Sequence, residues 1–195
     1  MSEFEQQIVE ILERAKAESL LVAYHREDQE PGYFCCGFFR EVEEGFAIFD
    51  DVGKFGYSDN EDAEAEAEIS AISWVEVDTP YLHGMQTIYN HRDRFVAPME
   101  SPVLDEPMSI WHAVAEACRE QRCCKFWLGG EDQEFGFVRR FEAPLVELEM
   151  VHEDDGSIAG RRTIRMELID SLRMGSRHEE MVQFLYESRY KFLDA

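Results

Sequence analysis

The hydrophobic pattern at the start of the chain is helical. Apolar residues recur on one side of residues 3–18, at Phe4, Ile8, Ile11, Leu12 and Ala15. Ser2 lies just before this stripe and Glu5 follows three residues later, which is the spacing of a capping box. The pattern therefore predicts an amphipathic helix over residues 3–18.

Beyond this helix, short runs of β-favouring residues are separated by turn residues. The runs predict strands at 19–24, 33–42, 45–52 and 69–77. The stretch 59–68 is rich in acidic residues and is expected to be a solvated loop or a strand extension. Thr79 followed by Pro80 predicts the start of a second helix, because proline is well tolerated at the first helical position.

The second half of the chain has the same kind of pattern. It predicts a helix over 109–121 and strands at 123–128, 134–141 and 145–151. From 163 to 168 apolar and polar residues alternate, which predicts one further half-buried strand. Ser176 with Glu179 predicts a second capping box and a closing helix.

Three matches between the halves occur in the same order. The apolar residues Ile8, Leu12 and Ala15 are repeated 102 positions later by Ile110, Val114 and Ala117. Residues 37–43 resemble 136–142, and residues 88–92 resemble 185–189. We interpret this as a duplicated unit. The expected division is a first repeat at 1–95, a proline-rich linker at 96–107 and a second repeat at 108–195.

Each unit combines one helix with several short strands, which predicts the α+β class. Short antiparallel strands of this kind favour a small, strongly bent barrel over a flat sheet, because a barrel hides its edges. The expected architecture is two tandem antiparallel β-barrels, Sm-like or SH3-like. Each barrel is preceded by an N-terminal helix and followed by a C-terminal helix.

The spacing of certain residues in both halves resembles a signature of the Sm-like family (LSm/Hfq type). The matching residues are Gly37, Phe39, Val42, Glu43 and Phe46 in the first half, and Gly136, Val138, Phe141, Glu142 and Leu145 in the second. In that family an asparagine follows and reads an RNA base. Ala47 and Val146 stand there instead, so the resemblance implies that the base-reading positions are lost in both repeats.

Composition narrows the classes of partner. The chain has 195 residues and a formal net charge of −23, which repels phosphate backbones and acidic membranes. No apolar run approaches the roughly 18 residues of a membrane span, and the acidic N-terminus lacks a secretory signal pattern. We therefore expect a cytoplasmic protein with no DNA partner and no membrane partner, and RNA binding is disfavoured by charge.

The second repeat holds the only local basic cluster. Arg161, Arg165 and Arg173 are candidate contacts for RNA or another anion. The alternative is that these arginines form ion pairs with neighbouring acidic residues or with the acidic first repeat.

No residue pattern indicates catalysis or a cofactor. The chain lacks a phosphate loop and a nucleophile elbow, so no catalytic residue and no cofactor are assigned. The pairs Cys35-Cys36 and Cys123-Cys124 suggest a zinc site at first, but neighbouring strand residues point to opposite faces. We therefore expect packing thiols and no metal.

The leading hypothesis is a non-enzymatic protein-interaction or assembly module, with protein partners or self-association, built from duplicated Sm-like barrels that have lost the RNA-base site. One alternative is single-stranded RNA binding through the arginine cluster of the second repeat. Another is a small-molecule enzyme or sensor with an unrecognised pocket.

Overall fold

The structure is a computed structural model that describes residues 2–27, 29–30, 34–53, 64–95, 97–98, 100–130 and 132–190. It divides into two compact units, Met1–Arg92 and Asp93–Ala195. Among the helices in these residues, none is both long enough and apolar enough to cross a membrane.

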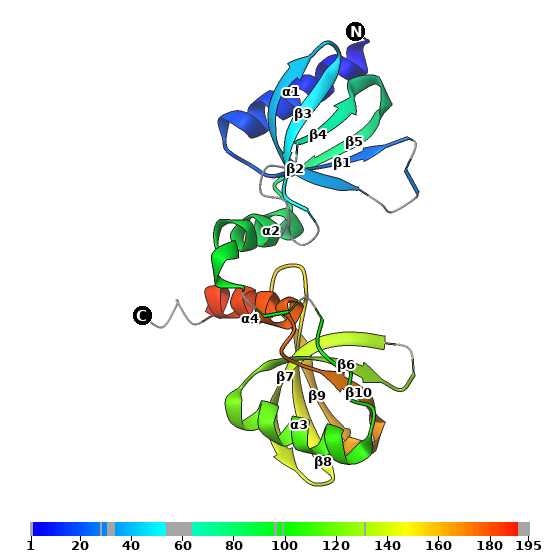
Figure 1. Ribbon diagram of the computed structural model, residues 1–195, viewed down its shortest axis with the longest axis vertical. Helices are drawn as coiled ribbons and strands as arrows, with labels where there is room; N and C mark the ends of the chain where they lie inside the picture. The colour runs from blue at the N-terminus through cyan, green and yellow to red at the C-terminus, as the bar shows by residue number, and fades with distance from the viewer. Residues whose placement is uncertain are drawn as a thin grey trace. The chain divides into compact units, whose positions relative to one another are not determined.

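The first unit is a helix, a five-stranded antiparallel sheet and a second helix (Figure 1). Its sheet has the order β4-β3-β2-β1-β5. In chain order the elements are α1 (Glu3–Ala17), β1 (Val22–Arg26), β2 (Cys35–Glu43), β3 (Phe46–Asp51), β4 (Glu64–Glu68), the 3₁₀ turn η2 (Ile69–Ala71), β5 (Ile72–Val77) and α2 (Pro80–Asn90).

The second unit repeats this series of elements. Its sheet has the order β10-β6-β7-β8-β9, which is the order of the first sheet when equivalent strands are compared. The elements are α3 (Pro107–Glu120), β6 (Cys123–Leu128), β7 (Asp132–Glu142), β8 (Leu145–Val151), β9 (Ile158–Arg165), the 3₁₀ turn η4 (Met166–Leu168), β10 (Ile169–Arg173) and α4 (Arg177–Tyr190). This correspondence is what a duplication requires.

Details inside the sheets also correspond. The register shifts between Phe39 and Glu41 in the first sheet and between Val138 and Arg140 in the second, which marks a bulge at equivalent places. A Cβ atom on Gly37 would lie 2.8 Å from the carbonyl oxygen of Asp50, and one on Gly136 would lie 2.7 Å from that of Glu149. Both strands therefore need glycine where the next strand approaches closely.

The helix caps explain where the helices begin. Ser2 and Glu5 form both hydrogen bonds of the predicted capping box at the start of α1. The Thr79 hydroxyl accepts a hydrogen bond from the Leu82 amide at the start of α2, and Pro80 is its first residue. Helix α3 begins at Pro107, two residues before the predicted start.

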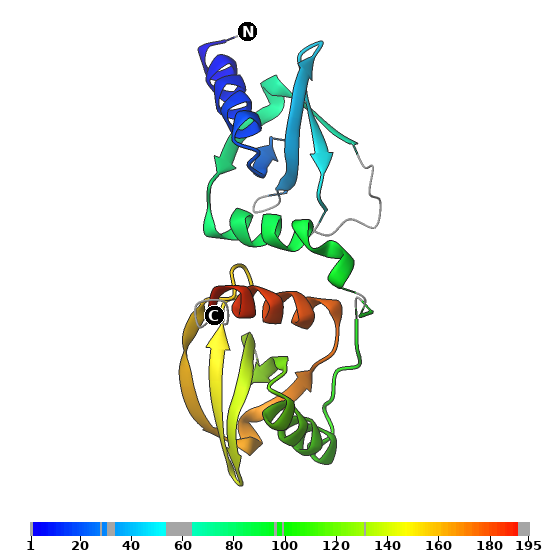
Figure 2. The ribbon, with the colours of Figure 1, turned by 90° about the vertical axis from the view of Figure 1, so that its left-hand side faces the viewer.

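Each sheet is covered by a helix on each face. In the first unit, Ile8 and Leu12 of α1 belong to one apolar cluster, and Leu82 and Met85 of α2 belong to another. In the second unit, Val114 of α3 and Val182 of α4 likewise belong to separate clusters. Figure 2 shows the two helices of each unit on different sides of its sheet. Both faces of each sheet therefore contribute to a core.

The prediction of closed barrels is wrong. Among the described strands, β4 and β5 end the first sheet without pairing with each other, and β9 and β10 do the same in the second. The three residues of η2 let the ends of β4 and β5 separate by at most about 14 Å. Four strand spacings of a flat sheet measure about 19 Å, so each sheet is strongly curved but remains open.

The chain crosses between sheet edges where the sequence predicted continuous strands. Of the predicted alternating strand at 163–168, residues 163–165 end β9, but the second half of the prediction is wrong, because Met166–Leu168 is the turn η4 between β9 and β10 at opposite edges. Ile69–Ala71 is the equivalent turn η2 inside the predicted strand 69–77. The alternation of polar and apolar residues continued through η4 and concealed it, and β-favouring residues in and after η2 concealed that turn.

Two other predicted segments have a definite place. The described residues of 96–107 belong to the second unit, where Leu104 pairs with Leu172 and the Ser101 hydroxyl donates to the Met174 carbonyl. Of the acidic stretch, residues 64–68 form β4, whereas 59–63 lie outside the described residues.

Candidate interaction surface

The outer half of the second sheet exposes charged residues on one face. Its strands pair in the order β7-β8-β9, with Glu149 opposite Arg161 and Leu145 opposite Arg165. Val146 and Leu148 belong to the core beneath α3. Because successive strand residues alternate in direction, the residues between them lie on the opposite face, together with Arg161, Thr163 and Arg165 of β9.

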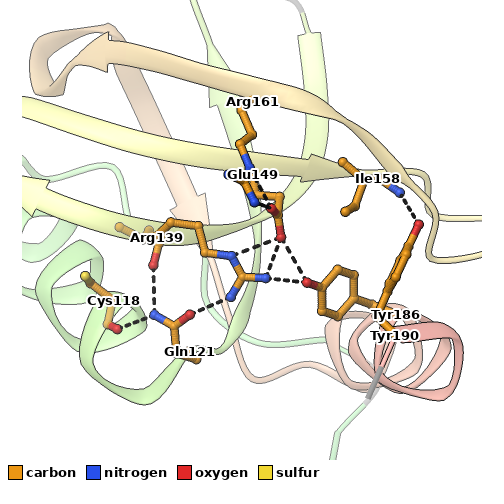
Figure 3. Close-up of polar contacts among 9 residues, drawn as sticks. Cys118, Gln121, Arg139, Glu149, Ile158, Arg161, Tyr186 and Tyr190 are labelled. Atoms are coloured by element: carbon orange, nitrogen blue, oxygen red, sulfur yellow. Dashed lines mark hydrogen bonds and ion pairs between the residues drawn. The ribbon is translucent and has the colours of Figure 1, made fainter. Parts of the chain in front are cut away.

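A buried carboxylate lies at the centre of this face (Figure 3). Glu149 is only 1% exposed. Its Oε1 atom accepts hydrogen bonds from Arg139 Nε at 3.0 Å and from the Tyr186 hydroxyl at 3.0 Å. Its Oε2 atom accepts one from Arg161 Nε at 2.8 Å. Three elements, β7, β9 and α4, therefore supply partners for one residue of β8.

These partners determine how Glu149 titrates. Burial alone would raise the pKa of the Glu149 carboxyl, but hydrogen bonds from Arg139, Arg161 and Tyr186 outweigh burial and lower the pKa below its usual value. Burial and the hydrogen bond to Glu149 raise the pKa of Tyr186. The glutamate is therefore ionised at neutral pH, and the tyrosine remains a donor.

The bulge in β7 and the end of α3 position Arg139. Its Nη1 atom donates to Gln121 Oε1, and Gln121 Nε2 donates to the carbonyl of Val138 at 3.2 Å (Figure 3). Gln121 has a φ of 52°, which ends α3 in the left-handed region. The bulge and Gln121 therefore position the Arg139 side chain for its contact with Glu149.

The same network fixes β9 in place. Besides the Arg161 contact, the Ile158 amide donates to the Tyr190 hydroxyl at 3.2 Å. Arg162 Nη1 forms an ion pair with Glu134 at 2.8 Å. Contacts at its first residue and, on both faces, at its centre therefore order this strand, although it lies at the edge of the sheet.

The structure does not bring the three predicted arginines together. Arg161 and Arg165 share a face of β9, but Arg173 belongs to β10 at the opposite edge. The Arg173 side chain is 15% exposed and donates to the buried Glu179 at 2.8 Å. Arg165 is highly exposed and contacts Glu167 at 3.3 Å. Each of the three arginines therefore has an acidic partner in the structure.

The two positions that correspond to the Sm-like asparagine lie in the cores. Ala47 and Val146 are both 0% exposed. Ala47 lies opposite the buried Ala67 of β4, and Val146 lies opposite the half-buried Ile164 of β9. A side chain at either place faces α1 or α3 rather than a ligand.

Two pockets flank β9. One of about 270 Å³ is lined by Arg139, Glu147, Arg161 and their neighbours, and the other, of about 580 Å³, extends from Glu134 to Arg162. The pairs Arg161–Glu149 and Arg162–Glu134 already neutralise much of the charge in these walls. We therefore do not assign a small ligand to either pocket.

The cysteine pairs pack into the cores. Cys123 and Cys124 point to opposite faces, yet both are buried because each face is covered by a helix. Burial raises the pKa of Cys36 and of Cys124 to about 12, which disfavours the thiolate that metal binding needs. Within the described ranges, no three His, Cys, Asp or Glu side chains are grouped to hold a metal ion.

Sequence reasoning missed Glu149 and Arg139. A signal was present, because Glu149 interrupts the apolar run of residues 148–151, and a charged residue in a buried strand needs a partner. The partners could not be named, because Arg139, Arg161 and Tyr186 come from three separate elements.

Comparisons of the chain with protein-family models, curated proteins and solved structures found no match.

Proposed function

We propose that this protein is a non-enzymatic protein-interaction module in which the outer edge of β9 binds an extended acidic segment of a protein partner. One observation carries the proposal. β9 is an eight-residue strand at the end of its sheet, and it contains Arg161, Arg162 and Arg165 but no acidic residue. An edge strand offers backbone N–H and C=O groups to an added strand, and the arginines favour a partner of negative charge.

The local charge supports an acidic partner despite the negative charge of the whole chain. One carboxylate, Glu149, is shared by Arg139 and Arg161, so this group keeps a net positive charge. The Arg161 side chain is 77% exposed even while it contacts Glu149. Arg165 contacts the exposed Glu167 at 3.3 Å, an interaction that a partner carboxylate can replace at little cost.

The order already present in β9 also supports binding. Tyr190 and Glu149 hold the strand before any partner arrives. A partner then has to order only its own backbone, which lowers the entropic cost of association.

The test uses a labelled peptide of alternating threonine and glutamate, as long as β9, with binding followed by fluorescence anisotropy. We expect binding that Arg165→Glu weakens about tenfold, since one cross-strand charge pair contributes up to about 1 kcal/mol and its reversal adds repulsion. Arg140→Glu is the matched control. Arg140 is also well exposed and pairs with Glu142, but it lies on β7, inside the sheet.

Three outcomes would overturn the proposal. The first is equal binding of a peptide in which lysine replaces glutamate, and the second is equal weakening by both variants. The third is binding of a short single-stranded oligouridine without binding of the acidic peptide, which would instead support RNA recognition.

A further inference from the structure

The edge of the first sheet has the composition that β9 requires of a partner. β4 reads Glu-Ala-Glu-Ala-Glu and contains no basic residue. Ala67 belongs to the core beneath α1, and Ala65 packs against that core. The glutamates Glu64, Glu66 and Glu68 therefore lie on the face opposite α1.

β4 and β9 are equivalent strands of opposite charge. Each is the fourth strand of its unit, each pairs with the third strand, and each ends its sheet. Arg161, Thr163 and Arg165 lie on the face opposite α3, as the glutamates of β4 lie opposite α1. The repeated scaffold thus presents one acidic and one basic edge.

We infer that the acidic segment bound by β9 is the β4 edge of a second copy of this chain, an inference that rests on the proposed function. An antiparallel pairing with Glu66 opposite Thr163 places Glu64 opposite Arg165 and Glu68 opposite Arg161. On the other face it places Ala65 opposite Ile164 and Ala67 opposite Arg162. Two glutamates then meet two arginines on one face, and the alanines meet one apolar and one basic residue on the other, so no like charges are opposed.

Antiparallel pairing of two β4 edges, or of two β9 edges, is disfavoured by charge. Two β4 strands would oppose Glu64 to Glu68, and two β9 strands would oppose Arg161 to Arg165. The contact is therefore heterologous, with a different surface from each copy, and it either closes into a ring or continues as a chain.

Repulsion between copies does not prevent this contact. Each copy has a net charge of −23, but at physiological ionic strength charges are screened beyond about 8 Å. Opposed residues on paired strands lie well within that distance, so the local complementarity decides the outcome.

The test is light scattering of the full chain over a wide range of concentration. We expect the mass of the wild-type protein to rise with concentration. Glu64→Arg and Arg165→Glu should each weaken association about tenfold, because each opposes like charges across the contact. Glu64→Arg also removes the exposed ion pair with Arg40 of the same unit, a small loss of stability that leaves the unit folded. The matched controls are Glu41→Arg and Arg140→Glu, which lie on β2 and β7, the central strands of their sheets, and should leave association unchanged.

Two recombinations identify the contact. The double variant Glu64→Arg with Arg165→Glu should associate again, because the charges are exchanged. An equal mixture of the two single variants should also associate, because one supplies an intact β4 edge and the other an intact β9 edge.

The inference is overturned if the wild-type protein remains monomeric at all concentrations or if neither recombination restores association. The acidic peptide separates this failure from that of the proposed function. A monomer that binds the peptide through β9 refutes only the second copy as partner, whereas a monomer that does not bind it refutes both.

Discussion

The charged contacts at the bulges of the two sheets occupy equivalent places but have inverted composition. In the first unit one arginine, Arg40, contacts two acids, Asp50 at 3.6 Å and Glu64 at 2.5 Å. In the second unit one acid, Glu149, contacts two arginines, Arg139 and Arg161. The same backbone therefore supports either sign of charge, because the bulge and the strand register fix only where the side chains meet.

The two contacts also differ in burial. The side chains of Arg40 and Asp50 are about half exposed, whereas Glu149 is fully buried. In the second unit Tyr186 of α4 also donates a hydrogen bond from its hydroxyl to Glu149. Its counterpart Tyr89 of α2 packs against Phe38 and Arg92, as Tyr186 packs against Phe137. One hydroxyl contact thus accompanies the change from a surface ion pair to a buried network.

The largest expected effect comes from removing the buried acid. Glu149→Ala leaves Arg139 and Arg161 without their shared carboxylate, and we expect a loss of about 3 kcal/mol of stability, at the low end for buried pairs because both arginines can reach water. Asp50→Ala should cost less than about 1 kcal/mol. Urea unfolding with hydrogen-exchange mass spectrometry reports the two units separately, and equal losses would contradict the contrast in burial.

A second prediction concerns the close approach between neighbouring strands at Gly37 and Gly136, which both units share. Alanine at Gly37 or at Gly136 would force its Cβ against a backbone carbonyl, so each substitution should destabilise its own unit by about 2 kcal/mol. The same exchange measurement checks this. A large effect in only one unit would show that the close approach is not a common requirement of the scaffold.

The smallest expected effect is a pH dependence of the second unit. The Glu149 pKa is lower in the folded protein than its ordinary value of 4.5, so the unfolded chain binds the proton more readily. The resulting stabilisation is fully present above pH 4.5 and is lost as the pH falls through the lowered folded pKa. The free energy of unfolding, measured across this pH range, should therefore depend more steeply on pH in the wild-type protein than in Glu149→Gln. Identical pH profiles for the two proteins would refute this prediction.

Local sequence signals predicted many of the elements. The apolar spacing and the Ser2 cap predicted α1 to within one residue, and Thr79-Pro80 predicted the start of α2. The matching glycines at 37 and 136 lie at equivalent close approaches between strands. The helix starts depend on contacts within a few residues, which is why the sequence alone reveals them, whereas the glycines were found only by matching the two halves of the chain.

Features that depend on distant contacts were predicted poorly. Residues 166–168 continue an alternating pattern, so nothing local marks the turn that carries the chain from β9 to β10. Closure of the sheets was predicted and is wrong, since hydrogen bonding between edge strands depends on the curvature of the whole sheet. Arg173 was grouped with Arg161 because the two are close in sequence, whereas they lie at opposite edges.

The sequence by itself determined the α+β composition, the repeated order of elements and the opposite charges of residues 64–68 and 161–165, because periodicity and charge are properties of short segments. Only the tertiary structure decided that these two segments are equivalent free edges among the described strands, and that Glu149 is buried between two arginines and a tyrosine. Those facts depend on which strands become neighbours and which helix covers them, and many weak contacts between remote residues decide that together.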